Sequence, residues 1–137
     1  MEEHVLLASS QKFPKQERLT SKKIIEELFS KGSSVYLYPF RLQFISKSGA
    51  EAVPQKSTFP QVLFSVSKRN FKKAVDRNSI KRSMREIYRK NKSQLFTSAH
   101  PEKQPAYIGI VYVAKEKIPF ELLEKKLILA WQRLVNN

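Results

Sequence analysis

The sequence predicts a single domain of the α/β (α+β) class, because helical and strand-like patterns alternate along it. Helical spacing of apolar residues occurs in residues 19–32, 77–92 and 119–134, and strand patterning occurs in residues 35–45, 62–67 and 107–113. The chain has 137 residues, of which 41% are hydrophobic and 11% aromatic. That is enough for one modest core and too little for two.

The first helix is predicted over residues 19–32. Its apolar residues recur at helical spacing: Ile24, Ile25, Leu28 and Phe29. Thr20 or Ser21 can cap its start through a side-chain oxygen. Gly32 suits the left-handed conformation that often follows the last turn of a helix.

The strands are predicted from alternation and from punctuation by proline and glycine. Residues 35–45 alternate at the period of a strand, and Pro39, which cannot donate a hydrogen bond, indicates an edge strand or a break. Residues 46–60 are expected to form a long hairpin loop that leads into a second strand of the same sheet at residues 62–67. Residues 107–113 are almost wholly apolar, which predicts a central strand.

The last helix is predicted to begin near Pro119, a residue well suited to a first turn. Its apolar stripe would bury it against the sheet and consists of Phe120, Leu123, Leu127, Ala130, Trp131 and Leu134.

Residues 1–17 lack periodicity, so we expect a flexible N-terminal tail there and one domain over residues 18–137. Cysteine is absent, which excludes disulfides and thiolate metal sites. His4 and His100 lie in polar sequence and are expected to be solvated. No apolar run approaches the roughly 20 residues of a membrane-spanning helix, so no membrane span is expected. The lack of cysteine fits a cytoplasmic protein, which is the location we expect.

The charge of the chain indicates a polyanionic partner. It has 26 Lys and Arg against 12 Asp and Glu, a formal net charge of +14 and a pI near 10.1. Between Lys68 and Lys92 there are 11 basic residues and two acids, Asp76 and Glu86, so this segment carries +9 of the +14. Positive charge is therefore concentrated on the second predicted helix.

That helix should be basic on one face and apolar on the other. Four cations fall within about 100° of arc, together with Asn78, when residues are placed 100° apart: Lys81, Arg82, Arg85 and Arg89. Ile80, Met84 and Ile87 fall opposite and can seat the helix on the sheet. Asp76 is expected to cap the helix.

The solvated face of an ordinary amphipathic helix is the plainer explanation of such a stripe. A solvated face usually interleaves Glu with Lys, however, whereas Lys81, Arg85 and Arg89 are like charges four residues apart, which destabilise a helix by a few tenths of a kcal/mol per pair. A bound anion would relieve that repulsion. Arginine also favours bidentate contacts with phosphate.

Residues 65–69 (SVSKR), followed by residues 74–86 (AVDRNSIKRSMRE), resemble the signature of the bacterial ribonuclease P protein family. In that family a strand ending in V-S-K-K/R leads into A-V-x-R-N-R-x-K-R-x-x-R-E, and the resemblance extends over about residues 18–135. It implies a two-layer α/β sandwich with three helices and a four-stranded, mostly antiparallel sheet. It also implies a left-handed βαβ crossover.

The resemblance implies the protein subunit of ribonuclease P, an endoribonuclease whose catalytic centre lies in its RNA. The subunit would bind the catalytic RNA, one protein to one RNA, and the 5′ leader of precursor tRNA. It would assist Mg²⁺-dependent removal of the leader, with Mg²⁺ held by the RNA and the substrate. The scattered carboxylates agree with a protein that has no catalytic or metal-binding residues of its own.

The same resemblance assigns two sets of binding residues. Contacts with the catalytic RNA go to Arg77, Asn78, Lys81, Arg82, Arg85 and Arg89; contacts with the leader go to Phe29, Arg41, Gln43, Ser65, Ser67 and Lys68. Ser79 replaces an arginine of the family motif. Ile25 and Gln43 stand where relatives often have aromatic residues, so stacking of leader bases should be weaker or supplied elsewhere. Core packing is the alternative role for Phe29.

Two other classes of function remain open. A ribosomal or other structural RNA-binding protein would explain the charge and the fold, but it would leave the polar residues Arg41, Gln43 and Ser65 without a purpose. An architectural DNA-binding protein is less favoured, because the sequence shows neither a helix-turn-helix nor a dimer seam.

Overall fold

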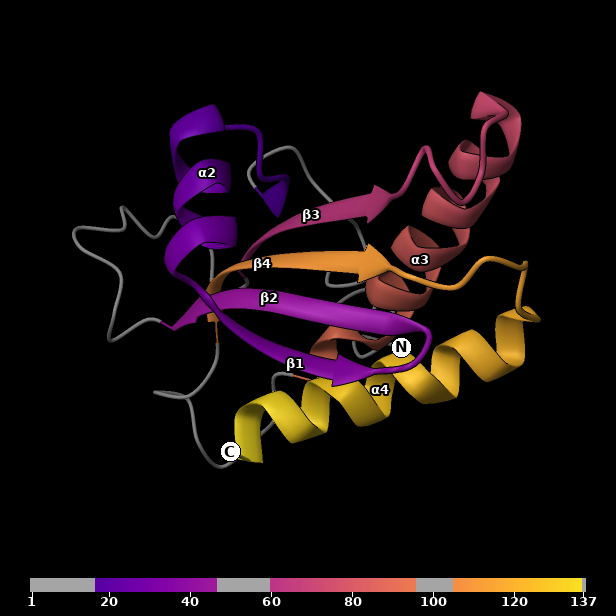
Figure 1. The fold of residues 1–137 in the computed structure, drawn as a ribbon. Helices are drawn as coiled ribbons and strands as arrows, with labels where there is room; N and C mark the ends of the chain where they lie inside the picture. Colours follow the sequence, from indigo (N-terminus) through magenta and orange to yellow (C-terminus); the bar gives the residue numbers. More distant parts are fainter. Residues whose placement is uncertain (1–16, 47–59, 96–104, 137) are drawn as a thin grey trace.

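The computed structural model describes residues 17–46, 60–95 and 105–136 (Figure 1). The elements, in chain order, are α2 (Lys22–Lys31), β1 (Ser33–Leu37), β2 (Phe40–Ser46), β3 (Gln61–Val66), α3 (Ala74–Leu95), β4 (Pro105–Tyr112) and α4 (Phe120–Asn136). The strands form one sheet in the order β1-β2-β4-β3. The β1/β2 and β2/β4 pairs are antiparallel and the β3/β4 pair is parallel, so the predicted mixed, mostly antiparallel sheet with three helices is confirmed.

Residues 35–45 form two strands, β1 and β2, with a break at the cis Tyr38–Pro39 peptide, which is one of the two outcomes predicted from Pro39. The expected hairpin between β2 and β3 does not form, since β4 lies between them. The almost wholly apolar sequence of β4 agrees with burial of this strand on both of its faces. Residues 47–59 lie outside the described part of the chain.

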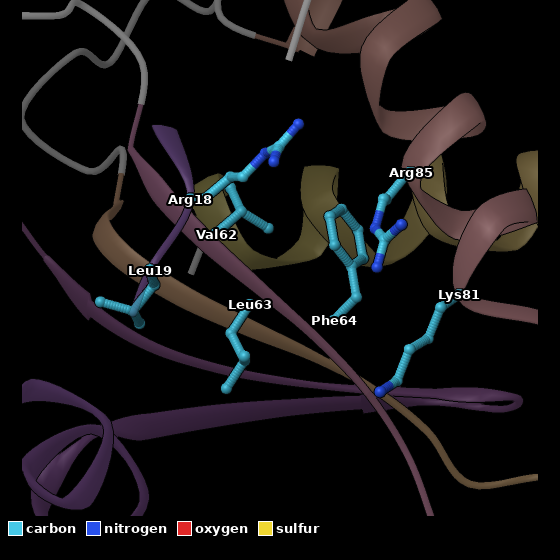
Figure 2. Close-up of a pocket in the computed structure, with 7 residues that line it drawn as sticks. All are labelled: Arg18, Leu19, Val62, Leu63, Phe64, Lys81 and Arg85. Carbon is cyan, nitrogen blue, oxygen red and sulfur yellow. The ribbon is translucent and has the colours of Figure 1, made fainter. Parts of the chain in front are cut away.

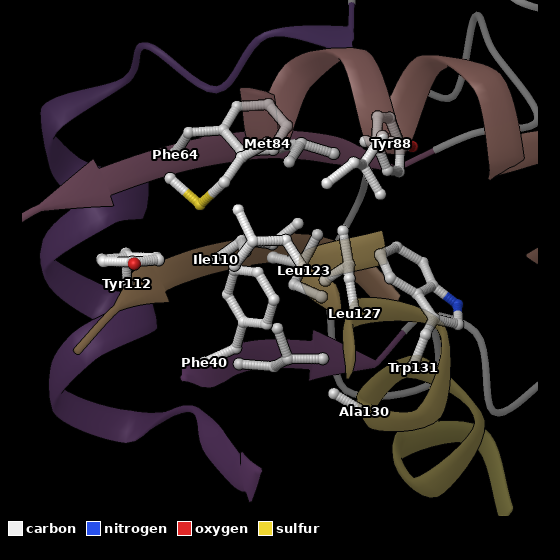
Figure 3. Close-up of a cluster of buried hydrophobic side chains, with 14 of the residues drawn as sticks. Phe40, Phe64, Met84, Tyr88, Ile110, Tyr112, Leu123, Leu127, Ala130 and Trp131 are labelled. Carbon is white, nitrogen blue, oxygen red and sulfur yellow. The ribbon is translucent and has the colours of Figure 1, made fainter. Parts of the chain in front are cut away.

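Alternation along the strands separates the sheet into two faces. One face packs against α3 and α4 and carries fully or nearly fully buried side chains, among them Phe40, Leu42, Phe64, Ile110 and Tyr112. Figure 3 shows Phe40, Phe64 and Ile110 of this face in one cluster with labelled residues of α3 and α4, among them Met84 and Trp131. The predicted apolar stripes of both helices are therefore confirmed, and they fix how each helix sits on the sheet.

Helix α2 packs on the opposite face of the sheet. The Ser21 hydroxyl accepts from the Ile24 N–H (3.4 Å), which confirms one of the two predicted caps. A Cβ on Gly109 of β4 would lie 3.3 Å from Leu28 and 3.1 Å from the Phe29 ring. The glycine thus lets α2 approach the sheet closely.

Gly32 ends α2, but not in the predicted left-handed conformation. Its φ is −72° and its ψ is 160°, so its backbone is extended. Glycine is needed there for lack of space: a Cβ would lie 2.4 Å from the Leu28 carbonyl oxygen and 2.9 Å from the Phe44 carbonyl oxygen. The helix passes directly into β1 at a point where two backbones nearly touch.

Helix α3 begins at Ala74, three residues before the predicted start, so Asp76 lies in its first turn and does not cap it. Asp76 instead forms an ion pair with Lys117 of the loop before α4 (Oδ1 to Nζ, 2.9 Å). The hydrogen bond from Lys117 lowers the pKa of the Asp76 carboxyl. The charge of Asp76 still suits the positive end of the helix.

Glu17 and Leu19 are packed against the rest of the described chain. Glu17, expected at the end of a flexible tail, is 4% exposed and its Oε1 lies 2.9 Å from Nζ of the equally buried Lys92. Leu19 donates its N–H to the Val62 carbonyl (3.0 Å), which holds this segment along the outer edge of β3. Residues 1–16 lie outside the described part.

Replacing Lys92 by Met should destabilise the protein by about 3–5 kcal/mol, because it leaves the Glu17 carboxylate buried without a countercharge. Chemical denaturation measures the change. The Glu17→Leu, Lys92→Met double variant should recover most of the loss, whereas Lys90→Met, at an exposed position of the same helix, should cost far less. Equal losses for Lys92→Met and Lys90→Met would contradict a buried ion pair.

Gly32→Ala should lower the free energy of unfolding by about 1–3 kcal/mol, because the new methyl group must displace backbone. Ser34→Ala, at an exposed site two residues away, is the control and should change it little. Equilibrium unfolding in urea compares the two. A fully stable Gly32→Ala protein would show that the α2–β1 junction is looser than the structure indicates.

Candidate nucleic-acid interface

The cationic face of α3 points away from the core because the opposite face is fixed there. Ile80, Met84 and Ile87 are 5%, 0% and 0% exposed, as the helical spacing predicted. Within the described residues, Lys81, Arg82 and Arg85 form no ion pair with a carboxylate. Three positive charges on one rigid helix therefore have no countercharge from the described part of the chain, which is the arrangement that an external polyanion can use.

Two of these cations line a cleft between α3 and the outer edge of β3. The cleft has a volume of about 300 Å³, and its walls include Lys81, Arg85, Val62 and Phe64. Figure 2 shows Lys81 and Arg85 extending from α3 toward β3. Arg18, from the segment beside β3, contributes a third cation to the lining. None of the described residues that line the cleft carries a carboxylate, so its charge suits a phosphate backbone.

Arg82 lies outside this cleft and is exposed on the same helix, as are Asn78 and Ser79. The predicted stripe is thus divided between a cleft and an open helix surface.

Arg77 and Arg89 differ from the other predicted RNA-binding residues because the protein already uses them. One Nη of Arg77 donates to the carbonyl oxygens of Phe71 (2.7 Å) and Lys72 (2.8 Å), which fixes the loop between β3 and α3. Arg89 forms a two-point ion pair with Glu86, three residues earlier. That contact lowers the pKa of Glu86 and raises that of Arg89. Both arginines therefore have structural partners, which the sequence reasoning did not foresee.

The loop after β3 holds Lys68 at the surface. The Phe71 N–H donates to the Ser67 carbonyl (3.1 Å), and the Ser67 hydroxyl accepts from the Arg69 N–H (3.1 Å). The Asn70 side chain donates to the Val113 carbonyl at the end of β4 (3.4 Å). The predicted leader residue Ser67 thus shapes a turn, and Lys68 is exposed within it.

The remaining predicted leader residues meet on the face of the sheet opposite α3 and α4. Arg41 of β2 pairs with Val111 of β4, which pairs with Ser65 of β3, so the three side chains form one row across the sheet. Gln43 belongs to the next row, beside Gly109 and Leu63. We call these two rows the open face.

Phe29 lies at the border of the open face. Its ring sits over Gly109 and is 39% exposed, so it both packs against the sheet and offers a surface to solvent. The Gln43 amide nitrogen donates to the carbonyl of Gly32, the residue that ends α2 (3.0 Å). Arg41, Gln43 and Ser65 thus share one face of the sheet, but the sequence did not reveal that Gln43 already has a partner.

Arg18 and Tyr36 are candidate residues that the sequence reasoning missed. Both adjoin predicted sites, Arg18 in the α3 cleft and Tyr36 beside Arg41 on the open face. The folded chain is needed to reveal these neighbours. Arg18 is more than 60 residues from Lys81, and Tyr36 is 29 residues from Ser65.

The described residues give no sign of metal or membrane chemistry. In residues 17–46, 60–95 and 105–136, no three His, Asp or Glu side chains gather in a way that could hold a metal ion. No helix in that part of the chain combines the length and apolar character that a membrane span requires.

Comparison with known proteins places this arrangement in one family. The family model described as Ribonuclease P matches residues 13–135. A ribonuclease P protein component from Chlorobium phaeobacteroides is 38% identical over 133 residues, covering 90% of this chain and 85% of its own length. The corresponding protein of Porphyromonas gingivalis is 31% identical over 123 residues, covering 90% and 86%.

Solved structures agree on the fold. The ribonuclease P protein of Thermotoga maritima superposes with a TM-score of 0.65 at 23% identity, covering 85% of this chain and 96% of that one. The protein from Staphylococcus aureus gives 0.63 at 21% identity, covering 85% and 94%. The matched family model, the curated relatives and the shared fold lead to one conclusion: this chain belongs to the ribonuclease P protein family and is a protein component of that tRNA-processing ribonuclease.

Proposed function

We propose that the chain serves ribonuclease P in two ways, through two surfaces. The cations of α3 bind the catalytic RNA, and the open face of the sheet binds the single-stranded 5′ leader of precursor tRNA. One protein joins one RNA in the cytoplasm, and the holoenzyme removes the leader to give mature tRNA 5′ ends. The observation that carries this proposal is the set Lys81, Arg82 and Arg85, held without a countercharge from the described residues on a helix whose other face is buried.

The catalytic step belongs to the RNA in this proposal. Mg²⁺ would be held by the RNA and the substrate, and the protein would supply countercharge and position the leader. Cations that neutralise phosphates reduce the repulsion between two RNA molecules, so the protein should matter most when Mg²⁺ is scarce.

The two surfaces use different chemistry. Lys81, Arg85 and Arg18 offer charge in a narrow cleft, which suits the backbone of a folded RNA. The open face offers Phe29, Arg41 and Ser65, a ring, a cation and a hydroxyl, which suits unpaired nucleotides with exposed bases. A purely structural RNA-binding protein would need only the first surface.

With the cognate RNA at low Mg²⁺, the native protein should restore cleavage of precursor tRNA. The Arg82→Ala, Arg85→Ala variant should bind the RNA about 30- to 150-fold more weakly, as expected if each of the two lost contacts contributes roughly 1–1.5 kcal/mol. Lys115→Ala, Lys125→Ala removes the same charge from exposed sites outside α3 and is the matched control. Full activity of the Arg82, Arg85 variant would refute the assignment of the helix face, and failure of the native protein would favour a structural RNA-binding role.

The salt dependence of RNA binding gives a separate test. Each neutralised phosphate contributes a slope of about −0.7 to −0.9 in a plot of log affinity against log salt, so five contacts give about −3.5 to −4.5. Arg82→Ala, Arg85→Ala should make the slope shallower by about 1.4–1.8. Arg89→Ala should change it less, because Glu86 already neutralises that arginine. A slope that stays the same in the double variant would exclude phosphate contacts from these two residues.

A further inference from the structure

Tyr36 is the most exposed aromatic residue in the part of the chain that the structure describes, and it does not belong to the hydrophobic core. It is 59% exposed, whereas Tyr88 and Tyr112 are fully buried. The Tyr112 hydroxyl donates to the Glu116 carbonyl and accepts from the Ile118 N–H, so that tyrosine has a structural role. Packing gives no comparable reason for an aromatic ring at position 36.

The strand register places Tyr36 on the open face. Tyr36 of edge strand β1 pairs with Arg41 of β2, and the row continues through Val111 to Ser65. Side chains of directly paired residues lie on the same side of a sheet. The ring of Tyr36 therefore extends the row of predicted leader residues by one strand.

The pairing also places the Tyr36 and Arg41 side chains at neighbouring positions on the same face of the sheet. The Tyr36 carbonyl accepts from an Nη of Arg133 on α4 (3.2 Å), so it points away from β2. Tyr36 and Arg41 thus form the non-hydrogen-bonded type of antiparallel pair, in which side chains approach more closely, with Cβ atoms about 4.5–5.5 Å apart. An aromatic plane and a cation side by side can hold a base and its phosphate together.

The identity of residue 43 makes an aromatic ring at position 36 more important for base stacking. Gln43 stands one row from Tyr36, its amide is engaged by Gly32, and it presents no ring to a base. Phe29, over Gly109 of β4, is two strands and one row from Tyr36. With about 4.8 Å between strands and 3.3 Å per residue, the two rings are roughly 12 Å apart. One base cannot contact both, so they would hold different nucleotides.

We propose that Tyr36 is a stacking platform for a base of the single-stranded 5′ leader, next to a phosphate held by Arg41. This inference rests on the proposed function. It assigns the stacking of a leader base to Tyr36, in a chain where Gln43 on β2 offers no aromatic ring. Charge complementarity favours this occupant, because the rows of Tyr36 and Gln43 contain a cation and no acid.

The test uses holoenzyme reconstituted from the full chain and its cognate RNA, with precursor tRNAs that carry either a long leader or a single leader nucleotide. Tyr36→Leu should weaken binding of the long-leader precursor by about 5- to 100-fold, the range expected for loss of one base stack. Binding of the short-leader precursor should stay unchanged. Tyr36→Phe keeps the ring and should retain native affinity.

A spectroscopic readout reports the stack itself. With 2-aminopurine placed at successive leader positions, one position should be quenched by the native and Tyr36→Phe holoenzymes and should brighten with Tyr36→Leu. The exposed position of Tyr36 predicts a nearly native unfolding temperature for both variants, which separates loss of stacking from loss of the fold.

The outcomes are distinguishable. Unchanged long-leader affinity in Tyr36→Leu, or an equal loss with both precursors, would overturn the proposal, since the second result would place Tyr36 against the tRNA body or the catalytic RNA. If the native holoenzyme itself bound both precursors equally well, the leader-binding function would fail, and the role of Tyr36 with it. The proposal is supported if Tyr36→Leu loses affinity for the long-leader precursor alone and Tyr36→Phe keeps the native affinity.

Discussion

The seating of α3 on the sheet is the constraint on which both surfaces depend. Ile80, Met84 and Ile87 occupy the core, so the helix cannot rotate without exposing them. Burial of each such side chain is worth roughly 1.5–3 kcal/mol, several times the repulsion of two like charges on a helix face. Packing of α3 against the core therefore keeps Lys81, Arg82 and Arg85 close together despite their mutual repulsion. An anionic partner can bind these charges without first having to bring them together.

The cations of this chain divide into two groups by their partners. Arg77 fixes a loop through carbonyl oxygens, Arg89 pairs with Glu86, and Lys92 is buried with Glu17. These contacts support the ends and the middle of α3. Lys81, Arg82 and Arg85 have no such carboxylate among the described residues. Counting basic residues overstates the binding surface, because part of the positive charge holds the protein together.

Much of the fold could be predicted from local patterns. The apolar stripes of α3 and α4 and the central position of β4 follow from periodicity and composition, which are properties of short segments. The order of the strands does not, because β3 and β2 are separated by a strand that comes after both. Gly32 illustrates the same limit: its place at the end of α2 was predictable, but the reason for glycine is a carbonyl of Phe44, twelve residues away.

The candidate site shows even more clearly the difference between what short segments predict and what depends on distant parts of the chain. The family motif brought attention to the helix face and to Arg41 and Ser65, and the sheet register does place these two in one row. Tyr36 and Arg18 were missed because their importance lies in neighbours from other strands and from α3, which only the folded chain brings together. The same packing allows Phe29 both roles considered for it, since Gly109 lets the ring rest on the sheet while one side stays exposed.

Directed cleavage of the RNA tests most directly whether the α3 face meets it. The chain contains no cysteine, so a single cysteine carrying an iron chelate can be placed at Ser79, beside the cations, or at the exposed Leu122 on α4 as a control. The account predicts strong, localised cuts in the catalytic RNA from position 79 and weak or no cuts from position 122. The reverse pattern, or equal cutting from both, would contradict it.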